Sequence, residues 1–199
     1  MVSPDEPVPE SYPNTTIRSV SWAKDIDLVR RFFQEYRQWL DEHRDVDPAV
    51  ASTVAAGLGG IDELITGLPG AYGPPRGEIL LAFEKEEPTA CLALREMEAR
   101  VGDLKRLYVR PDHRGPVFGR RFTKALLARA RELGYERVRV DTLATMYAAI
   151  EFYQEAGFTP IPGYWPHPVR GALFFECVLG NASSPPKRHR PSISKRSAK

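Results

Sequence analysis

Two hydrophobic periodicities alternate along this chain, and their order limits the folds that it can adopt. Apolar residues recur at helical spacing in residues 29–40, 118–133 and 148–153, and they form short strand-like runs before, between and after these segments. The order of the predicted elements is β-α-α-β-β-β-α-β-α-β-β. Helices interleaved with strands in this way predict an α/β fold around one mixed sheet.

The element boundaries follow from local breaks in the two patterns. A second, weaker helix is expected over Pro48–Leu68, broken by Gly57, Gly59 and Gly60, and Pro69–Gly77 is rich in glycine and proline, which indicates a loop. Two apolar runs flank a charged turn at residues 84–88 and predict a hairpin. The strands are expected at Thr16–Val20, Ile79–Phe83, Thr89–Leu94, Gly102–Val109, Val138–Val140, Phe158–Ile161 and Leu173–Leu179.

Composition separates a folded body from two ends. Of the 199 residues, 42% are hydrophobic and 27% are charged, as in an ordinary globular protein. Residues 1–13 contain four prolines, and residues 181–199 contain six basic residues and no acidic one. Both ends are expected to be flexible, with the folded domain at 14–180. Residues 1–180 carry 22 basic and 26 acidic residues. The body is therefore mildly acidic, and the basic excess belongs to the tail.

Cysteine usage and the lack of a long apolar run bear on location. Cys91 and Cys177 lie in apolar runs, where a thiol behaves as a small hydrophobe, and this indicates a reducing compartment. The sequence has no run of about 18 apolar residues and no leader-like start, so neither a membrane span nor secretion is expected. We predict a cytoplasmic protein, with the nucleus left open by the basic tail.

One predicted strand carries a break in its alternation. Between Gly102 and Val109 the apolar residues are Leu104, Leu107 and Val109, which is a step of three followed by a step of two. Such a phase shift is typical of a β-bulge. We therefore expect this strand to part from its neighbour and to leave backbone groups free around Leu107–Val109.

The segment after this strand has features of an anion site. Pro111 fixes a turn, Arg114, Gly115 and Gly119 follow, and a helix begins near Phe118. A helix N-terminus offers unpaired N–H groups and a positive dipole end to a phosphate. A loop with glycine and arginine is equally common without a ligand, so the spacing alone leaves both interpretations open. Neither a Gly-Lys-Ser/Thr P-loop nor a GxGxxG motif is present.

Two blocks of this region resemble a known family. The run Arg114-Gly115-Pro116-Val117-Phe118-Gly119 is similar to the Arg/Gln-x-x-Gly-x-Gly/Ala signature of the GNAT superfamily of N-acetyltransferases. The run from Ala149 to Phe158 is similar to that family's Ala-x-x-x-Tyr-x-x-x-Gly-Phe block, at the family's separation. The resemblance covers residues 16–180. It implies a mixed, mostly antiparallel sheet flanked by helices, with a splayed fourth strand, and acetyl-CoA as co-substrate without a metal.

The resemblance also implies which residues bind acetyl-CoA. Arg114 and Arg120, with Arg121 beside them, supply positive charge where a pyrophosphate would lie. Val117 stands where the family has its first signature glycine, and Met146 stands where many members have an asparagine that contacts the cofactor. Both replacements bear on the affinity for acetyl-CoA. The implied cofactor-binding residues are Leu107, Tyr108, Val109, Arg114, Gly115, Val117, Phe118, Gly119, Arg120 and Met146.

Acetyl transfer to an amine needs a base, donors for an oxyanion and an acid for the departing thiolate. Tyr153 matches the family's tyrosine near the coenzyme sulfur and is the implied acid, although a tyrosine on an amphipathic helix is also expected in a core. Tyr147 lies on another side of that helix and ranks second. Asp103 is the predicted base. Glu96, Glu98 and deprotonation through water remain alternatives.

The acceptor site is expected between the first two helices and the loop Pro162–Arg170. Tyr164, Trp165 and His167 are its candidate substrate-binding residues, and a rigid proline-rich connection explains the loop equally well. We expect direct transfer to an amine of a small molecule or peptide. The alternative is a non-catalytic acyl-CoA-binding module with the same fold.

Other partners find less support in the sequence. The four histidines have no metal-ligand spacing. The basic tail lacks the interleaved aromatic residues of a single-strand binder, which disfavours nucleic acid as the main partner. The sequence does not distinguish a monomer from a homodimer.

Overall fold

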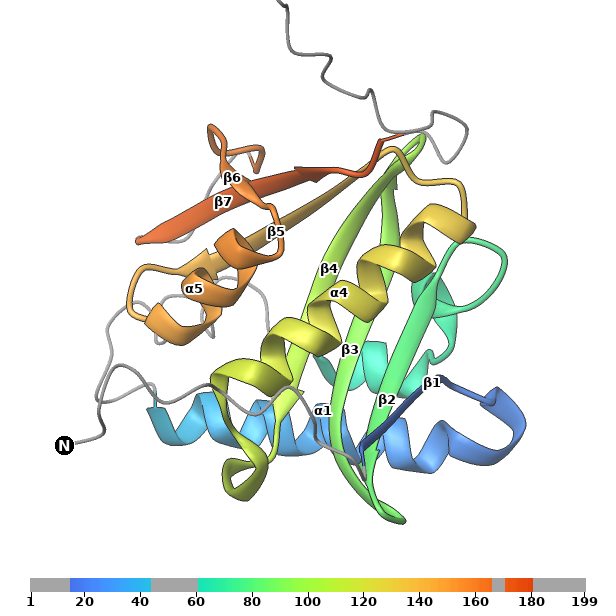
Figure 1. Ribbon diagram of the computed structural model, residues 1–199. Coiled ribbons are helices and arrows are strands. Elements are labelled where there is room, and N and C mark those ends of the chain that lie inside the picture. Colours follow the sequence, from blue (N-terminus) through green and yellow to red (C-terminus); the bar gives the residue numbers. More distant parts are fainter. Residues whose placement is uncertain (1–14, 44–60, 166–170, 181–199) are drawn as a thin grey trace, which may run out of the picture.

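The computed structural model describes residues 15–43, 61–165 and 171–180 (Figure 1). Within these ranges the chain forms β1 (Thr15–Ser19), α1 (Trp22–His43), α3 (Ile61–Thr66), the 3-10 turn η2 (Gly70–Tyr72), β2 (Glu78–Glu84), β3 (Glu87–Glu98), β4 (Val101–Val109), the 3-10 turn η3 (Pro111–His113), α4 (Pro116–Glu132), β5 (Arg137–Leu143), α5 (Tyr147–Glu155), β6 (Thr159–Pro160) and β7 (Ala172–Val178).

The strands form one sheet in the order β1-β2-β3-β4-β5-β7-β6. Neighbouring strands are antiparallel except β4 and β5, which are parallel. A parallel pair needs a crossover connection, and α4 provides it between β4 and β5. The predicted α/β class and the mixed, mostly antiparallel sheet are both confirmed.

Helices cover both faces of the sheet, as Figure 1 shows. α4 and α5 pack on one face, where Leu126 joins Leu80 in an apolar core. α1, α3 and η2 pack on the opposite face, where Phe33 joins Leu81 in a second core. Adjacent residues of β2 thus serve different cores, and burying one such leucine contributes about 1.5–3 kcal/mol. We call these two sides the α4 face and the α1 face.

β4 contains the bulge that its broken alternation predicted. Arg106 and Leu107 of β4 together stand opposite the single residue Leu92 of β3. Arg106 has φ = 56°, in the left-handed region that few residues other than glycine adopt. Leu104 and Leu107 both contact the core of the α4 face. The extra residue therefore accounts for the step of three between these two leucines.

Two predicted elements differ in extent from the structure. Of the helix expected over Pro48–Leu68, only the end is described, as α3, and the loop expected at Pro69–Gly77 contains η2 with a buried Tyr72. The strand expected at Phe158–Ile161 is shortened to Thr159–Pro160. Its central residue, Pro160, has no N–H to donate, so the ladder with β7 is short.

Several other predictions concern the cysteines and the chain ends. Cys91 and Cys177 are both free and buried, as the apolar runs predicted. No helix in the described ranges is long and apolar enough to cross a membrane. The ends predicted to be flexible, 1–13 and 181–199, lie outside the described residues, and so does residue 14 of the predicted domain.

Candidate active site

β4 and β5 pair only at their beginnings. Their register runs from Val101 opposite Arg137 to Asp103 opposite Arg139, and beyond that point the strands diverge (Figure 1). The edge of β4 from Leu104 to Val109 therefore has no described strand beside it on the β5 side. Backbone groups that a continuous ladder would satisfy face this opening. The opening corresponds to the splayed fourth strand that the family resemblance implied.

Three predicted cofactor residues lie on this part of β4, and their side chains point into the two cores. Leu107 and Val109 contact the core of the α4 face. Tyr108 is buried on the α1 face, where its ring packs edge-on against Phe32 and Tyr36 at centroid distances of 6.3 and 6.2 Å. These side chains fix the strand, so only its backbone is available to a ligand in the opening.

The start of α4 lies one short turn beyond β4. Gly115 precedes the helix in an extended conformation (φ 179°, ψ 155°) and Pro116 is its first residue. No side chain caps this end. The N–H groups of Val117 and Phe118 have no acceptor within the helix, so this end suits a phosphate. The fold thus combines an unpaired strand edge with an uncapped helix N-terminus, which is what an acyl-CoA needs.

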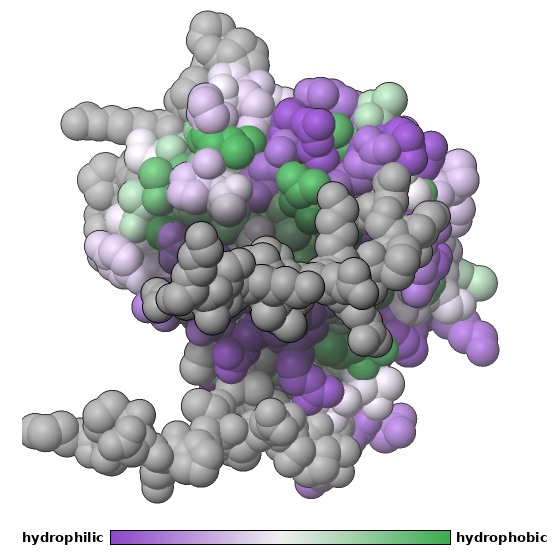
Figure 2. All heavy atoms as spheres, turned by 45° about the horizontal axis from the view of Figure 1, so that its top comes forward, coloured by the Kyte–Doolittle hydropathy of each residue, from purple (hydrophilic) through white to green (hydrophobic). Residues whose placement is uncertain are grey.

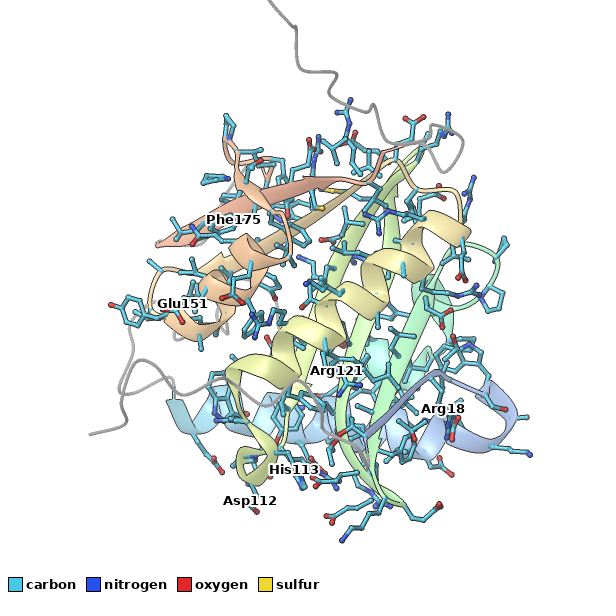
Figure 3. The ribbon with its side chains drawn as sticks, in the orientation of Figure 1. Arg18, Asp112, His113, Arg121, Glu151 and Phe175 are labelled. Atoms are coloured by element: carbon cyan, nitrogen blue, oxygen red, sulfur yellow. The ribbon has the colours of Figure 1, made fainter. Side chains whose placement is uncertain are left out.

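The arginines expected around this helix start differ in their contacts. The Nε atom of Arg114 donates to the carbonyl of Val109 at 3.0 Å, and its guanidinium lies 5.5 Å from the Trp39 ring centroid. Arg120 forms an ion pair with Glu155 of α5 at 3.2 Å. Figure 3 shows Arg121 on α4 beyond the turn that carries Asp112 and His113. Arg114 thus holds the loop, and Arg120 holds α5.

Gly119 has a structural role that its motif position did not reveal. A Cβ atom at this residue would lie 2.9 Å from two ring carbons of Phe152 on α5. The missing side chain therefore lets α4 approach α5 closely. This contact fixes the position of α5 and of the residues that it carries.

Tyr153 is buried on α5 beside the opening. Its ring packs against Phe152 and Phe158 at centroid distances of 5.2 and 5.5 Å. Burial, and then the nearby Tyr36 and Asp141, raise the pKa of the phenol. The phenol is therefore neutral at physiological pH, and it holds its proton more tightly than an exposed tyrosine does. The core role and the acid role predicted for Tyr153 are compatible with this geometry, whereas Tyr147 is 73% exposed and faces away.

Met146 stands just before α5, at its N-cap position. Its sulfur accepts a long hydrogen bond from Thr142 Oγ1 at 3.5 Å, and its side chain packs against Leu40 and Leu143. A thioether donates no hydrogen bond, so this side chain cannot replace the amide donor that the family's asparagine supplies.

Asp103 is fully buried at the last pairing of β4 with β5. Its Oδ2 accepts hydrogen bonds from Arg95 Nε at 3.0 Å and Nη2 at 2.9 Å. Its Oδ1 accepts no hydrogen bond from the described residues and lies 3.4 Å from Lys105 Nζ. Burial raises the pKa of Asp103, and the positive charges of Lys105 and Arg95 only partly oppose this effect. Oδ1 of the predicted base therefore has an ion-pair neighbour, Lys105, but no hydrogen bond from the described residues.

Asp141 of β5 is a site residue that we did not predict. Lys105 Nζ contacts its Oδ1 across the opening, so Lys105 links the carboxylates of Asp103 and Asp141. Asp141 is also one of the charges that raise the pKa of Tyr153. The available signal was its position one residue after Val140, which places it on the face opposite to that core residue.

Two of the three predicted substrate-binding residues join this cluster. Tyr164 Oη and Trp165 Nε1 lie 3.4 and 3.5 Å from Asp141 Oδ1. The Trp165 ring also lies 5.4 Å from Lys105 Nζ, and burial followed by Asp141 raises the pKa of Tyr164. The third residue, His167, lies outside the described residues. In the described part of the chain, no group of acidic, histidine or cysteine residues is arranged to hold a metal.

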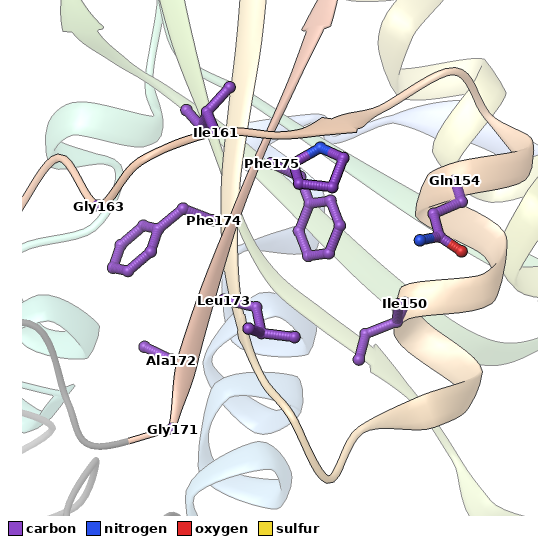
Figure 4. A pocket seen from close by; sticks show the side chains of 10 residues that line it. Ile150, Gln154, Ile161, Gly163, Gly171, Ala172, Leu173, Phe174 and Phe175 are labelled. Carbon is purple, nitrogen blue, oxygen red and sulfur yellow. The ribbon is translucent and has the colours of Figure 1, made fainter.

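A separate groove lies outside this cluster. It has a volume of about 680 Å³ and runs between α5 and β7 (Figure 4). Its lining is mainly apolar, and Figure 2 shows hydrophobic residues at the surface on the side of the molecule where α5 and β7 lie. Among the described residues, no acid or base lines the groove, so the reactive groups remain those at the opening between β4 and β5. The lining residues are Ile150, Gln154, Pro160, Ile161, Gly163, Gly171, Ala172, Leu173, Phe174 and Phe175.

Comparison with known proteins identifies the family. The model of the acetyltransferase (GNAT) family matches residues 29–158, and the chain belongs to this family. It is 28% identical over 172 residues to an uncharacterized N-acetyltransferase of Schizosaccharomyces pombe, a match that covers 83% of this chain and 96% of that protein. Membership of the family makes the chain an acyltransferase that takes its acyl group from acetyl-CoA.

Solved structures share the fold at lower identity. The PaiA N-acetyltransferase of Thermoplasma acidophilum, in complex with coenzyme A, is 15% identical with a TM-score of 0.61, over 82% of this chain and 98% of that one. YncA of Salmonella typhimurium, with its cofactor acetyl-CoA, is 19% identical with a TM-score of 0.55, over 87% and 99%. These two matches show that the fold is shared. The roles of individual residues are argued from the contacts described above.

Proposed function

We propose that the protein transfers the acetyl group of acetyl-CoA directly to the amine of a small acceptor molecule, as an N-acetyltransferase. The observation that carries the proposal is the end of β4–β5 pairing at Asp103 and Arg139, with acid–base groups gathered just beyond it. Acetyl-CoA supplies the activated acyl group, and the amine nitrogen displaces the thiolate at the acyl carbon. A direct transfer needs both substrates to meet in the opening at once.

The residues proposed for acetyl-CoA lie along one side of the opening. Backbone groups of Leu107–Val109 bind its amide-bearing arm, and the N–H groups at the start of α4 bind its pyrophosphate. Arg114 and Arg120 bind the same pyrophosphate through their positive charge. To do so, Arg114 releases the carbonyl of Val109 and Arg120 releases Glu155.

The residues proposed for proton transfer lie where the two strands part. Asp103 accepts the amine proton on Oδ1, and its raised pKa makes it a stronger base than an exposed aspartate. Tyr153 donates its phenolic proton to the departing thiolate and is restored from solvent. Tyr164 and Trp165, held beside Asp141, form a wall of the acceptor pocket.

The test combines binding with turnover. Calorimetry is expected to show saturable binding of acetyl-CoA, weakened when Arg114 and Arg120 are both changed to Ala. Thiol release is then followed against a broad panel of amines for the wild type and for Asp103→Asn and Asp141→Asn. A larger loss of kcat in Asp103→Asn supports Asp103 as the base, and a larger loss in Asp141→Asn transfers that role to Asp141. An absence of acetyl-CoA binding at millimolar concentration would overturn the proposal.

A further inference from the structure

Arg106 is a cation beside the proposed active site that no carboxylate neutralises among the described residues. Its guanidinium carbon lies 5.7 Å from the ring centroid of Tyr36 on α1. Its Nε atom is buried and finds no hydrogen-bond acceptor in the described part of the chain. A buried N–H group without an acceptor is destabilising, so one that persists in a native fold calls for an explanation such as a functional role or a bound water or ion.

The other charged groups around Arg106 are already paired. Asp103 binds Arg95 and Lys105, and Asp141 binds Lys105. Glu35, which precedes Tyr36 on α1, receives two hydrogen bonds from Arg110, at 3.0 and 2.8 Å. Arg139 pairs with two further carboxylates, Glu98 and Glu176. Around the two aspartates, three cations (Arg95, Lys105 and Arg106) therefore face two carboxylates, and among the described residues Arg106 contacts Tyr36 but has no carboxylate partner.

The bulge is the reason that Arg106 is on this side of the sheet. Leu104 and Leu107 contact the core of the α4 face, and a regular strand would turn the residue at 106 toward that apolar core as well. Instead, the left-handed backbone at Arg106 turns its side chain to Tyr36 on the α1 face, as Lys105 turns to Asp141. A strained residue that persists in a fold is a reason to look for a functional role.

A second buried polar group lies near the same cation. Tyr72 is 2% exposed, and its hydroxyl has no hydrogen-bond partner among the described residues. Burial raises the pKa of this phenol, and Arg106, followed by Arg95 and Asp103, exerts the strongest charge effects on it. The neutral hydroxyl is a donor, so Tyr72 and Arg106 together offer donors and positive charge to one acceptor group.

We propose that the acceptor amine carries an anionic group, such as the carboxylate of an amino acid, and that Arg106 and Tyr72 bind this anion. The inference rests on the proposed N-acetyltransferase function. The acceptor then spans the cluster, with its amine toward Asp103 and its anion toward Arg106. Arg106 determines specificity and takes no part in the proton transfers.

Matched acceptor pairs test this proposal. The probes are amino acids against their amides, and ω-amino acids against alkylamines of equal chain length, in the same thiol-release assay. We expect kcat/KM to be at least about tenfold higher for the carboxylate member of a pair, a factor typical of one charge-assisted contact. Arg106→Gln is expected to abolish this preference mainly through KM, and Arg106→Lys to restore part of it.

The control variant is Arg100→Gln. Arg100 also has a positive φ, 65°, but it is exposed in the turn between β3 and β4 and pairs with Glu136. It is expected to keep the wild-type preference. Thermal unfolding of each variant verifies folding, and Tyr72→Phe gives a second route to the same site if Arg106→Gln does not fold.

The outcomes separate this inference from the function on which it rests. Two results would overturn the anion site and leave the proposed acetyltransferase function intact. One is that neutral amines are acetylated as efficiently as their carboxylate partners. The other is that the preference for the carboxylate member is unchanged in both Arg106→Gln and Tyr72→Phe. If no acceptor is turned over, calorimetry measures binding of the same acceptor pairs to the protein with coenzyme A. Tighter binding of the carboxylate member, lost in Arg106→Gln, then supports the anion site, and equal binding of both members overturns it.

Discussion

Lys105 of β4 and Asp141 of β5 form an ion pair across the opening between the two strands. The backbone register of these strands ends with Asp103 opposite Arg139, and Lys105 and Asp141 would stand opposite each other if it continued. A side-chain contact therefore joins the two strands two residues beyond their last backbone pairing. It limits how far the strands part at the base of the opening.

Removal of this contact should weaken the fold measurably. In Lys105→Met, the buried Asp103 loses one of its two cationic neighbours and Asp141 loses its partner. We expect the free energy of unfolding to fall by about 2 kcal/mol, as for a lost hydrogen bond between charged groups. Urea denaturation measures this change. Lys124→Met, at an exposed position of α4, is the control, and equal midpoints for the two variants would contradict the role given to Lys105.

Tyr153→Phe isolates the phenol oxygen from the packing of the ring. We expect kcat to fall by about 100-fold, within the range for general acid catalysis, with little change in acetyl-CoA binding. Steady-state kinetics and calorimetry provide the two measurements. Tyr147→Phe removes an exposed hydroxyl on the same helix and should behave as the wild type. Unchanged turnover in Tyr153→Phe would exclude the phenol from the reaction.

Gly119→Ala tests the close approach of α4 to α5. The new methyl group would meet Phe152 at 2.9 Å, so the helices must separate or the ring must move. We expect a loss of about 1–3 kcal/mol in unfolding free energy, which is typical of overpacking. Thermal unfolding followed by circular dichroism checks this, and Phe152→Leu in the same chain should recover part of the loss. Additive effects of the two substitutions would show that this contact is not the cause.

Asp25 provides a pH dependence outside the active site. Hydrogen bonds from Arg18 Nη1 and Nη2, at 2.6 and 2.9 Å, lower its pKa, and Ser21 N–H donates to it at 2.7 Å. A carboxyl whose pKa is lower in the folded state stabilises the fold at pH values above its unfolded-state pKa of about 4. This contribution is lost as the pH falls through the folded-state pKa. Asp25→Asn should therefore cost about 1 kcal/mol at pH 7 and less at pH 3. Urea denaturation at both pH values gives the comparison, and a difference that grows toward pH 3 would contradict the assignment.

Local sequence patterns predicted the β4 bulge and the start of α4, because each of these features depends on residues close together in the chain. The step from Leu104 to Leu107 predicted the bulge, since alternation along one strand depends only on that strand. The run from Arg114 to Gly119 likewise predicted a helix start, and α4 begins there at Pro116. The resemblance to the GNAT superfamily, which rests on this run and on the block from Ala149 to Phe158, is confirmed by the family match.

The pairing of charges could not be predicted in the same way. Lys105 and Asp141 are 36 residues apart, and their contact depends on the register of two strands that meet for only three residues. The side of the sheet on which Arg106 lies depends on its left-handed backbone angle, at the bulge where the register between β3 and β4 shifts. The sequence likewise gave no sign that Arg114 would bond to Val109.

The opening between β4 and β5 also bears on self-association. An unpaired strand edge at the border of a sheet is a template on which another chain can add a strand. Here the unpaired edge of β4 lies in the interior of the sheet order, with β5 on its far side and helices over both faces. The unpaired part of β4 is therefore not a free border of the sheet on which a second chain could add a strand.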